Sequence, residues 1–94
     1  MDGDLTLLSF SDRLFGLSPL GRLGESYRGW VWIPNCQIIH TFTLRLPIDL
    51  VWIDSSGKPI AFEFALPPRS IRRCAAAYGV RERYTSLAFQ GFRD

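Results

Sequence analysis

The chain has 94 residues, of which 47% are hydrophobic and 14% aromatic, and its formal net charge is +2. This length supports a single domain spanning residues 1–94 and excludes two domains. No apolar run is long enough for a transmembrane helix, and the acidic start MDGDLTLLSF is not typical of a signal peptide, so we expect a cytoplasmic protein without a membrane partner.

The first third of the chain predicts a strand, a short helix and a loop. Residues 5–10, LTLLSF, are apolar enough for a strand. Residues 11–16, SDRLFG, begin with capping side chains and end in glycine, which predicts a short N-terminal helix. Residues 18–29 hold three glycines and a proline, which is typical of a loop.

The middle third predicts strands. Residues 30–34, WVWIP, are typical of a strand that ends at its proline. Residues 36–46 alternate, which predicts a half-buried strand with one mostly apolar face: Cys36, Ile38, His40, Phe42, Leu44 and Leu46. Residues 48–53 are apolar on both faces except at Asp49, so we expect a strand in the middle of the sheet.

A β-hairpin is predicted around residues 54–57, DSSG, because they supply a backbone-binding aspartate and a glycine that can take positive φ. The strand over residues 59–66 returns antiparallel. Its alternation predicts that Ile60, Phe62 and Phe64 face the core and that Glu63 faces outward.

The C-terminal third is open to two interpretations. Apolar residues at helical spacing between Ser70 and Gly79 predict two helical turns. Residues 85–94 are apolar enough to dock, but their pattern places no element.

The thirteen aromatic residues of the chain cannot all be buried on one side of one sheet. The expected fold is therefore mainly β with a minor helical part (α+β), a compact antiparallel or mixed β-sandwich or barrel.

The order of residues in the middle of the chain resembles the signature of the domain-of-unknown-function 192 family, small bacterial and archaeal proteins of unassigned role. The matching residues are Arg13, Gly16, Leu17, Cys36, Ile39, His40, Thr41, Phe42, Arg45, Pro47, Ile48, Asp49, Asp54, Gly57, Leu66, Pro67 and Cys74. The resemblance implies a strand near residues 78–84 after an irregular crossing, which we favour over the helix. Leu44 replaces a usual methionine, and Val80 to Arg83 replace an apolar Val-Leu-Glu-Leu.

Cys36, His40 and Asp49 are the candidate catalytic residues, because a thiol, an imidazole and a carboxylate can form an activated nucleophile. On an extended strand Cys36 and His40 lie about 13 Å apart, which argues against direct contact. With Cys74 these two residues could bind zinc, but the paired short spacings of zinc sites are missing. We expect reduced thiols, no metal and no cofactor.

The candidate binding residues are aromatic and basic. A groove lined by His40, Phe42 and Trp52, with Arg45 or Arg69 at its mouth, would suit a small anionic ligand. Arg45 and Asp49 are expected to pair across the bend at Pro47, so Asp49→Asn should mainly lower stability.

The chain is interpreted as a non-enzymatic binding or accessory protein, whose partner is a protein or a small anionic ligand. One alternative is a metal-dependent or thiol enzyme centred on Cys36 and His40. Another uses the C-terminal arginines to bind nucleic acid or acidic partners, although no known nucleic-acid motif accompanies them. These arginines are Arg69, Arg72, Arg73, Arg81, Arg83 and Arg93.

Overall fold

The computed structural model describes residues 5–7, 17 and 27–86, and this part of the chain consists of strands and their connections. The strands are β1 (Leu5–Thr6), β2 (Val31–Pro34), β3 (Ile38–His40), β4 (Ile48–Ile53), β5 (Pro59–Leu66), β6 (Ile71–Arg73) and β7 (Gly79–Tyr84). The mainly β class is thereby confirmed. The predicted helix at residues 11–16 and the tail from residue 87 lie outside the described residues. The described part holds no helix long and apolar enough to cross a membrane.

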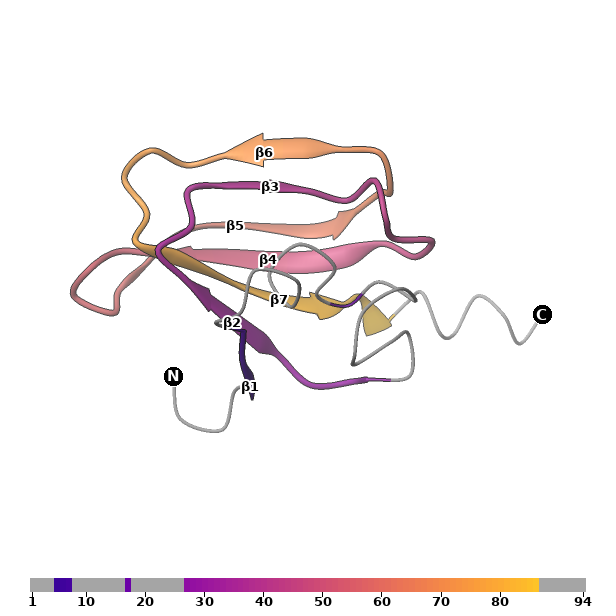
Figure 1. The fold of residues 1–94 in the computed structure, drawn as a ribbon, viewed down its shortest axis with the longest axis horizontal. Coiled ribbons are helices and arrows are strands. Elements are labelled where there is room, and N and C mark those ends of the chain that lie inside the picture. Colours follow the sequence, from indigo (N-terminus) through magenta and orange to yellow (C-terminus); the bar gives the residue numbers. More distant parts are fainter. Residues whose placement is uncertain (1–4, 8–16, 18–26, 87–94) are drawn as a thin grey trace.

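The strands form two sheets (Figure 1). The larger sheet has the order β1-β2-β7-β4-β5, in which β1 and β2 are parallel and the other neighbours are antiparallel. β3 and β6 form a separate antiparallel pair, which we name the β3–β6 ribbon. The described strands therefore make a mixed, two-sheet arrangement, and the larger sheet does not close into a barrel.

The β4–β5 hairpin forms where the sequence predicts it. The Asp54 carboxylate accepts hydrogen bonds from the backbone N–H groups of Ser56, at 2.9 Å, and Lys58, at 3.0 Å. Gly57 takes a φ of 88°, a left-handed conformation that glycine adopts without steric cost. β4 lies between β5 and β7, as its apolar composition indicates.

Two other segments differ from their local patterns. The strand predicted over residues 36–46 is wrong beyond His40, because the Thr41 carbonyl accepts a hydrogen bond from the Leu44 N–H at 3.1 Å and closes a turn. The helical interpretation of residues 70–79 is also wrong, since β6 and the start of β7 occupy this range. Pairing with β3 gives β6 hydrogen bonds that outweigh its helical spacing. The strand implied by the family resemblance near residues 78–84 is confirmed as β7.

The hydrophobic core lies on one face of the larger sheet, which we call the inner face. It contains Val31, Ile33, Ile48, Leu50, Trp52, Leu66, Val80 and Tyr84 from the sheet, together with Leu7, Leu17, Ile39 and Ala77. Ile39 is the inward residue of β3, so the β3–β6 ribbon covers part of this core. The ribbon is therefore held in place by burial, and its opposite side faces solvent.

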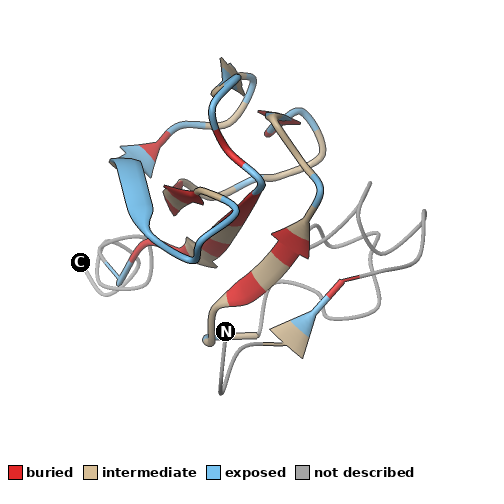
Figure 2. Cartoon of the chain, turned by 90° about the vertical axis from the view of Figure 1, so that its left-hand side faces the viewer, coloured by how far each residue is buried: buried red, intermediate tan, exposed pale blue. Residues whose placement is uncertain are grey.

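β5 exposes the side chains that its alternation predicts to be buried (Figure 2). Phe62 is 67% and Phe64 is 62% exposed, while Glu63 lies opposite the buried Leu50. The pairing of β4 with β5 shifts register between Ile48 and Leu50, where Ala65 takes a left-handed φ of 55°. This β-bulge inserts one residue, so Leu66 points into the core although Phe62 and Phe64 point away from it.

Candidate functional site

The β3–β6 ribbon has an inner and an outer side because successive strand residues alternate in direction. Its register pairs Ile38 with Arg73, Ile39 with Arg72 and His40 with Ile71. Ile39 is buried, whereas Ile38, His40, Ile71 and Arg73 are exposed. The outer side of the ribbon therefore carries two isoleucines, one histidine and one arginine.

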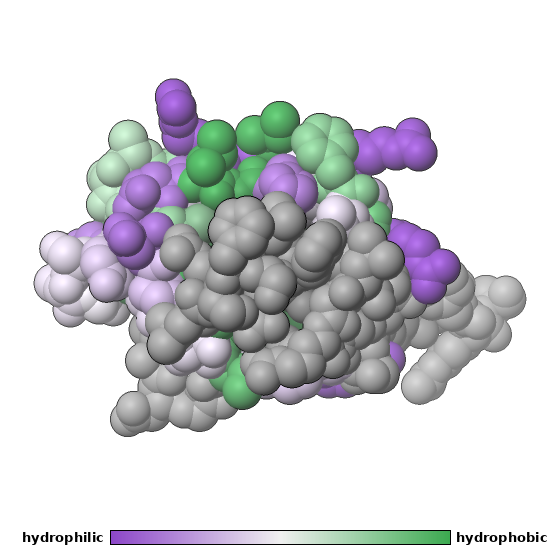
Figure 3. All heavy atoms as spheres, in the orientation of Figure 1, coloured by the Kyte–Doolittle hydropathy of each residue, from purple (hydrophilic) through white to green (hydrophobic). Residues whose placement is uncertain are grey.

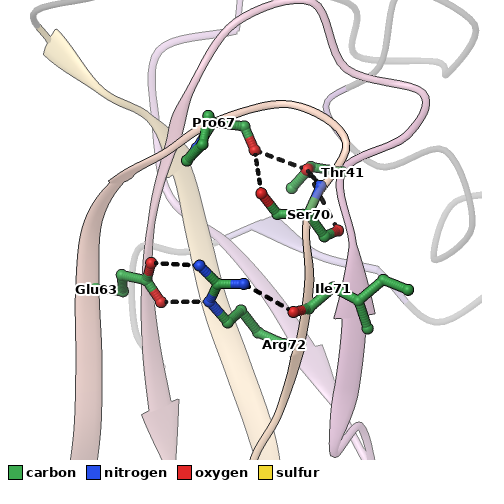
Figure 4. Close-up of polar contacts among 6 residues, drawn as sticks. All are labelled: Thr41, Glu63, Pro67, Ser70, Ile71 and Arg72. Atoms are coloured by element: carbon green, nitrogen blue, oxygen red, sulfur yellow. Dashed lines mark hydrogen bonds and ion pairs between the residues drawn. The ribbon is translucent and has the colours of Figure 1, made fainter.

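One end of the ribbon is fastened by Thr41, which is fully buried (Figure 4). The Thr41 hydroxyl donates a hydrogen bond to the Pro67 carbonyl and accepts one from the Ser70 N–H, each at 2.9 Å. The Ser70 hydroxyl also donates to the Pro67 carbonyl at 2.8 Å. A threonine at this position thus joins the end of β3 to the connection between β5 and β6.

The middle of the ribbon is tied to β5 by Arg72 and Glu63 (Figure 4). The Arg72 guanidinium donates two hydrogen bonds to the Glu63 carboxylate, at 2.8 and 3.1 Å, and a third to the Ile71 carbonyl at 2.9 Å. The hydrogen bonds that Arg72 donates to Glu63 raise the pKa of Arg72 above its usual value. The two-pronged geometry fixes the orientation of the ribbon as well as its position.

The outer side of the ribbon extends into an apolar surface, which we name the crest: Ile38, His40, Phe42 and Ile71. The exposed fractions are 55% for Ile38, 56% for Phe42 and 54% for Ile71. The rings of His40 and Phe42 contact each other, with centroids 5.6 Å apart. Figure 3 shows hydrophobic atoms along the edge where β3 and β6 run, with hydrophilic atoms at both ends.

His40 is oriented by its neighbour on the crest. The Phe42 backbone N–H donates to Nδ1 of His40 at 3.3 Å, so Nδ1 acts as the acceptor of the imidazole. In the neutral ring the proton then resides on Nε2. The crest therefore combines an apolar surface with one hydrogen-bond donor.

The predicted binding residues lie in three different places. His40 and Phe42 lie on the crest, and the Arg69 N–H donates to the Thr41 carbonyl at 3.3 Å, which places exposed Arg69 beside the crest. Arg45 is exposed in the connection between β3 and β4. Trp52 is only 4% exposed and belongs to the core, so it does not line a surface groove with the others.

The predicted catalytic residues have separate environments. His40 is exposed on the crest, whereas Cys36 is partly buried against the core, and its thiol donates to the Ile38 carbonyl at 3.2 Å. Asp49 binds groups from β5, β7 and Thr85. Neither Cys36 nor Cys74 is in a disulfide, and the described residues contain no group of three or more His, Cys, Asp or Glu that could hold a metal ion.

Asp49 organises the bulge of β5. Its carboxylate accepts hydrogen bonds from the Ala65 N–H at 3.0 Å, from the Thr85 hydroxyl at 2.6 Å and from Arg83 Nε at 3.1 Å. Burial of Asp49 opposes its charged form, but the hydrogen bonds from Thr85, Ala65 and Arg83 outweigh burial and lower its pKa. Asp49 therefore pairs with Arg83, a partner 34 residues away that sequence reasoning missed.

Sequence reasoning also missed Glu82, which lies on the inner face between Val31 of β2 and Leu50 of β4. Glu82 is 8% exposed, and burial raises the pKa of its carboxyl from 4.5 to about 7. The signal was present in the alternation of Val80, Glu82 and Tyr84, which puts a carboxyl on the apolar side of β7. A buried carboxyl that titrates near neutrality makes folding stability depend on pH.

Comparison of this chain with family models, with curated proteins and with solved structures found no match. Membership of the domain-of-unknown-function 192 family thus stays a prediction from the signature residues. Several of these residues have structural tasks in the fold: Thr41 fastens the ribbon, Asp49 holds the bulge, and Asp54 and Gly57 form the turn. His40 and Phe42 are exposed on the crest.

Proposed function

We propose that this protein is a non-enzymatic binding protein of the domain-of-unknown-function 192 type, whose crest docks an apolar, acidic segment of a partner protein. The observation that carries the proposal is the exposure of Ile38, Phe42 and Ile71 around His40, which is paired with Ile71 in the register and contacts the ring of Phe42. Contiguous exposed apolar side chains rimmed by polar ones mark interaction sites on soluble domains. Aromatic and arginine side chains at such a surface are typical of protein interfaces.

The charge around the crest specifies the partner. Arg73 is paired in register with Ile38, and Arg69 lies beside the end of β3, so exposed guanidinium groups flank the apolar residues. Arg72, by contrast, is engaged by Glu63 on the inner side of the ribbon. A partner segment that presents carboxylates next to apolar side chains would match this arrangement and would be steered toward it.

The ribbon supplies a rigid base for docking. Thr41 and Arg72 fix it to the connection after β5 and to β5 itself, and Ile39 anchors it in the core. The crest residues are therefore held in place before a partner binds, which reduces the entropy lost on association.

The test uses two fluorescein-labelled peptides of equal length, one alternating leucine with glutamate and one alternating leucine with lysine, and measures binding by fluorescence anisotropy. We expect the glutamate peptide to bind more tightly and its affinity to fall as salt is added. The double variant Phe42→Ser with Ile71→Ser should weaken binding at least about tenfold, as for interface residues with large truncation effects. Cys36→Ala should leave binding unchanged.

Phe62→Ser is the matched control, because Phe62 is as exposed as the crest residues but lies on β5. It should retain the affinity of the unmodified protein. Equal binding of both peptides would contradict the role of the flanking arginines. Equal loss of binding in the Phe62 and crest variants would contradict the location of the site.

A further inference from the structure

The two edges of the larger sheet differ in length. Among the described residues, β1 ends the sheet on one side with two residues, and β5 ends it on the other side with eight. An edge strand presents a row of backbone N–H and C=O groups that no neighbouring strand binds, and this row can pair with a strand of another chain. β5 is therefore the longer place at which a further strand could join the sheet.

β5 is exposed along almost its whole length (Figure 2). Every residue from Pro59 to Ala65 is exposed except Glu63, which is half-buried. Phe62 is 67% and Phe64 is 62% exposed, and their rings pack against each other with centroids 5.3 Å apart. The edge thus combines backbone groups that can form a ladder with an apolar surface whose removal from water favours association.

The two ends of β5 limit how far a partner strand can follow it. Pro59 has no backbone N–H to donate, and Ala65 takes a left-handed φ of 55° at the bulge. Prolines and bulges of this kind are the features that stop pairing along an edge. The segment between them, Ile60–Phe64, has an extended backbone throughout, so a partner strand can pair with these five residues.

The charge within this segment is already neutralised. Glu63 is its charged residue, and Arg72 donates two hydrogen bonds to the Glu63 carboxylate, at 2.8 and 3.1 Å. Glu63 lies on the inner face, opposite Leu50 in the register, so the alternating residues Phe62 and Phe64 lie on the outer face. The segment therefore fits a partner strand that is apolar and uncharged, and the same segment of a second molecule meets this description.

We propose that β5 of one molecule pairs antiparallel with β5 of a second copy, so that the larger sheets of the two molecules become one continuous sheet. A contact of this kind uses the same surface on both molecules, and its two-fold symmetry closes it after two copies. The edges that remain are the two β1 strands, with two described residues each, which are too short to recruit further copies. The product is therefore a dimer and not a fibre.

The limits of the segment determine the register of the pairing. An axis that keeps the ladder within Ile60–Phe64 passes through the middle residue, Phe62. Phe62 then lies opposite Phe62 of the second copy, and Ile60 lies opposite Phe64. An axis at Glu63 would instead place two carboxylates opposite each other and would carry the pairing into the bulge. The axis at Phe62 avoids both costs.

The size of the contact indicates a weak dimer. Each copy contributes two phenylalanines and Ile60 to one apolar cluster on the outer face, since directly opposed residues project on the same side of a sheet. The two phenylalanines expose roughly 250 Å² in each copy, because an aromatic side chain has an area of about 200 Å². The total buried area is therefore below the roughly 1,200 Å² of standard interfaces, and we expect a dissociation constant on the order of 10 μM.

The test is analytical ultracentrifugation of the whole chain from about 1 μM to about 1 mM. We expect the average mass to rise from that of one chain toward that of two. Phe62→Lys should remain monomeric at all concentrations, because two ammonium groups would meet at the axis, whereas Phe62→Tyr should retain the dimer. Phe42→Lys is the matched control, because Phe42 is 56% exposed but lies on the crest, and it should dimerise like the unmodified protein. Circular dichroism establishes that each variant is folded.

Cross-linking tests the register. In Phe62→Cys the two introduced thiols face each other with Cα atoms about 5 Å apart, within the range of a disulfide. In Phe64→Cys the two Cα atoms lie four residues apart along the ladder, about 13 Å, which a disulfide cannot span. After oxidation we expect a covalent dimer of Phe62→Cys on a non-reducing gel. We expect none of Phe64→Cys or of the unmodified protein, which retains Cys36 and Cys74.

Three outcomes would overturn the proposal. The first is the mass of a single chain at every concentration, which would exclude a second copy as the partner of β5. The second is a dimer that persists in Phe62→Lys, which would place the contact between copies elsewhere on the molecule. The third is equal cross-linking of the two cysteine variants, which would rule out a two-fold axis at Phe62.

Discussion

Glu82 leads to the most quantitative prediction from the structure. Its carboxyl lies between Val31 and Leu50, which are 0% and 1% exposed, and burial raises its pKa from 4.5 to about 7. The unfolded chain therefore releases this proton near pH 4.5, whereas the folded chain holds it until about pH 7. Between these values the unfolded state binds fewer protons, so the free energy of unfolding must fall as the pH rises.

The size of this effect follows from the two pKa values. The interval of about 2.5 pKa units between 4.5 and about 7, at about 1.4 kcal/mol for each unit, corresponds to a total loss of about 3.5 kcal/mol, of which about 3 kcal/mol falls between about pH 4.5 and about pH 8. At pH 7 half of the folded molecules still hold the proton, so the loss is complete only about one unit above that pH, after which the contribution is constant. For a small domain with a total stability of about 5–15 kcal/mol, this is a large fraction.

The perturbation is Glu82→Gln, which keeps the shape of the side chain and removes its ionisation. Urea unfolding followed by tryptophan fluorescence, at constant ionic strength from about pH 4.5 to about pH 8, measures the free energy of unfolding of both proteins. We expect the unmodified protein to lose about 3 kcal/mol over this range and the variant to lose much less. Glu63→Gln is the matched control, because it retains Glu82 and should retain the loss.

The reasoning fails if the unmodified protein and Glu82→Gln give parallel pH profiles. Parallel profiles would mean that Glu82 ionises at the same pH in the folded and unfolded states, so its carboxyl would not be desolvated in the fold. An increase in stability with pH across this window, absent from the variant, would contradict the sign of the shift.

Three further predictions concern other contacts. Asp49→Asn should lower the free energy of unfolding by about 1–3 kcal/mol at neutral pH, because it weakens the charged hydrogen bonds that hold the bulge. The folded state lowers the pKa of Asp49 from 3.8, so the difference in stability between the two proteins should disappear as the pH falls below 3.8 and Asp49 becomes protonated. Denaturant titrations at neutral pH and at acidic pH test this. Thr41→Val should cost about 2 kcal/mol in the same measurement, because the Ser70 N–H loses its acceptor and the Pro67 carbonyl loses one of its two donors. An unchanged midpoint would show that these hydrogen bonds do not stabilise the connection after β5. Gly79→Ala should lower the melting temperature, with a cost of about 1–3 kcal/mol, because the added Cβ would lie 2.5 Å from the Trp32 ring and 2.6 Å from the Ile33 carbonyl oxygen. A melting temperature equal to that of the unmodified protein would mean that β2 and β7 can separate at no cost.

The hairpin of β4 and β5 was predictable because its information is local. A turn of four residues with an aspartate and a glycine, between two apolar runs, leaves few alternatives to an antiparallel pair. The last strand was different, since the spacing of residues 70–79 is helical and only the family resemblance indicated β7. Local periodicity failed there because β3 supplies a partner strand from more than thirty residues earlier in the chain.

The candidate sites were predictable in part. His40 and Phe42 were predicted to line a groove with Trp52 and are exposed. Ile38 and Ile71 of the crest were not predicted as binding residues, because nothing in the sequence shows that β3 pairs with β6. Trp52 was assigned to a groove, but its neighbours across the sheet place it in the core.

The sequence by itself determined where most of the central strands begin and end, because turn residues and alternation act over a few positions. Only the tertiary structure decided which side of each strand meets the core. The bulge at Ala65 shows why: one inserted residue reverses the direction of every side chain beyond it, and Asp49, 16 residues away, accepts a hydrogen bond from the bulged backbone. The exposure of Phe62 and Phe64 thus depends on long-range pairing that the local sequence does not contain.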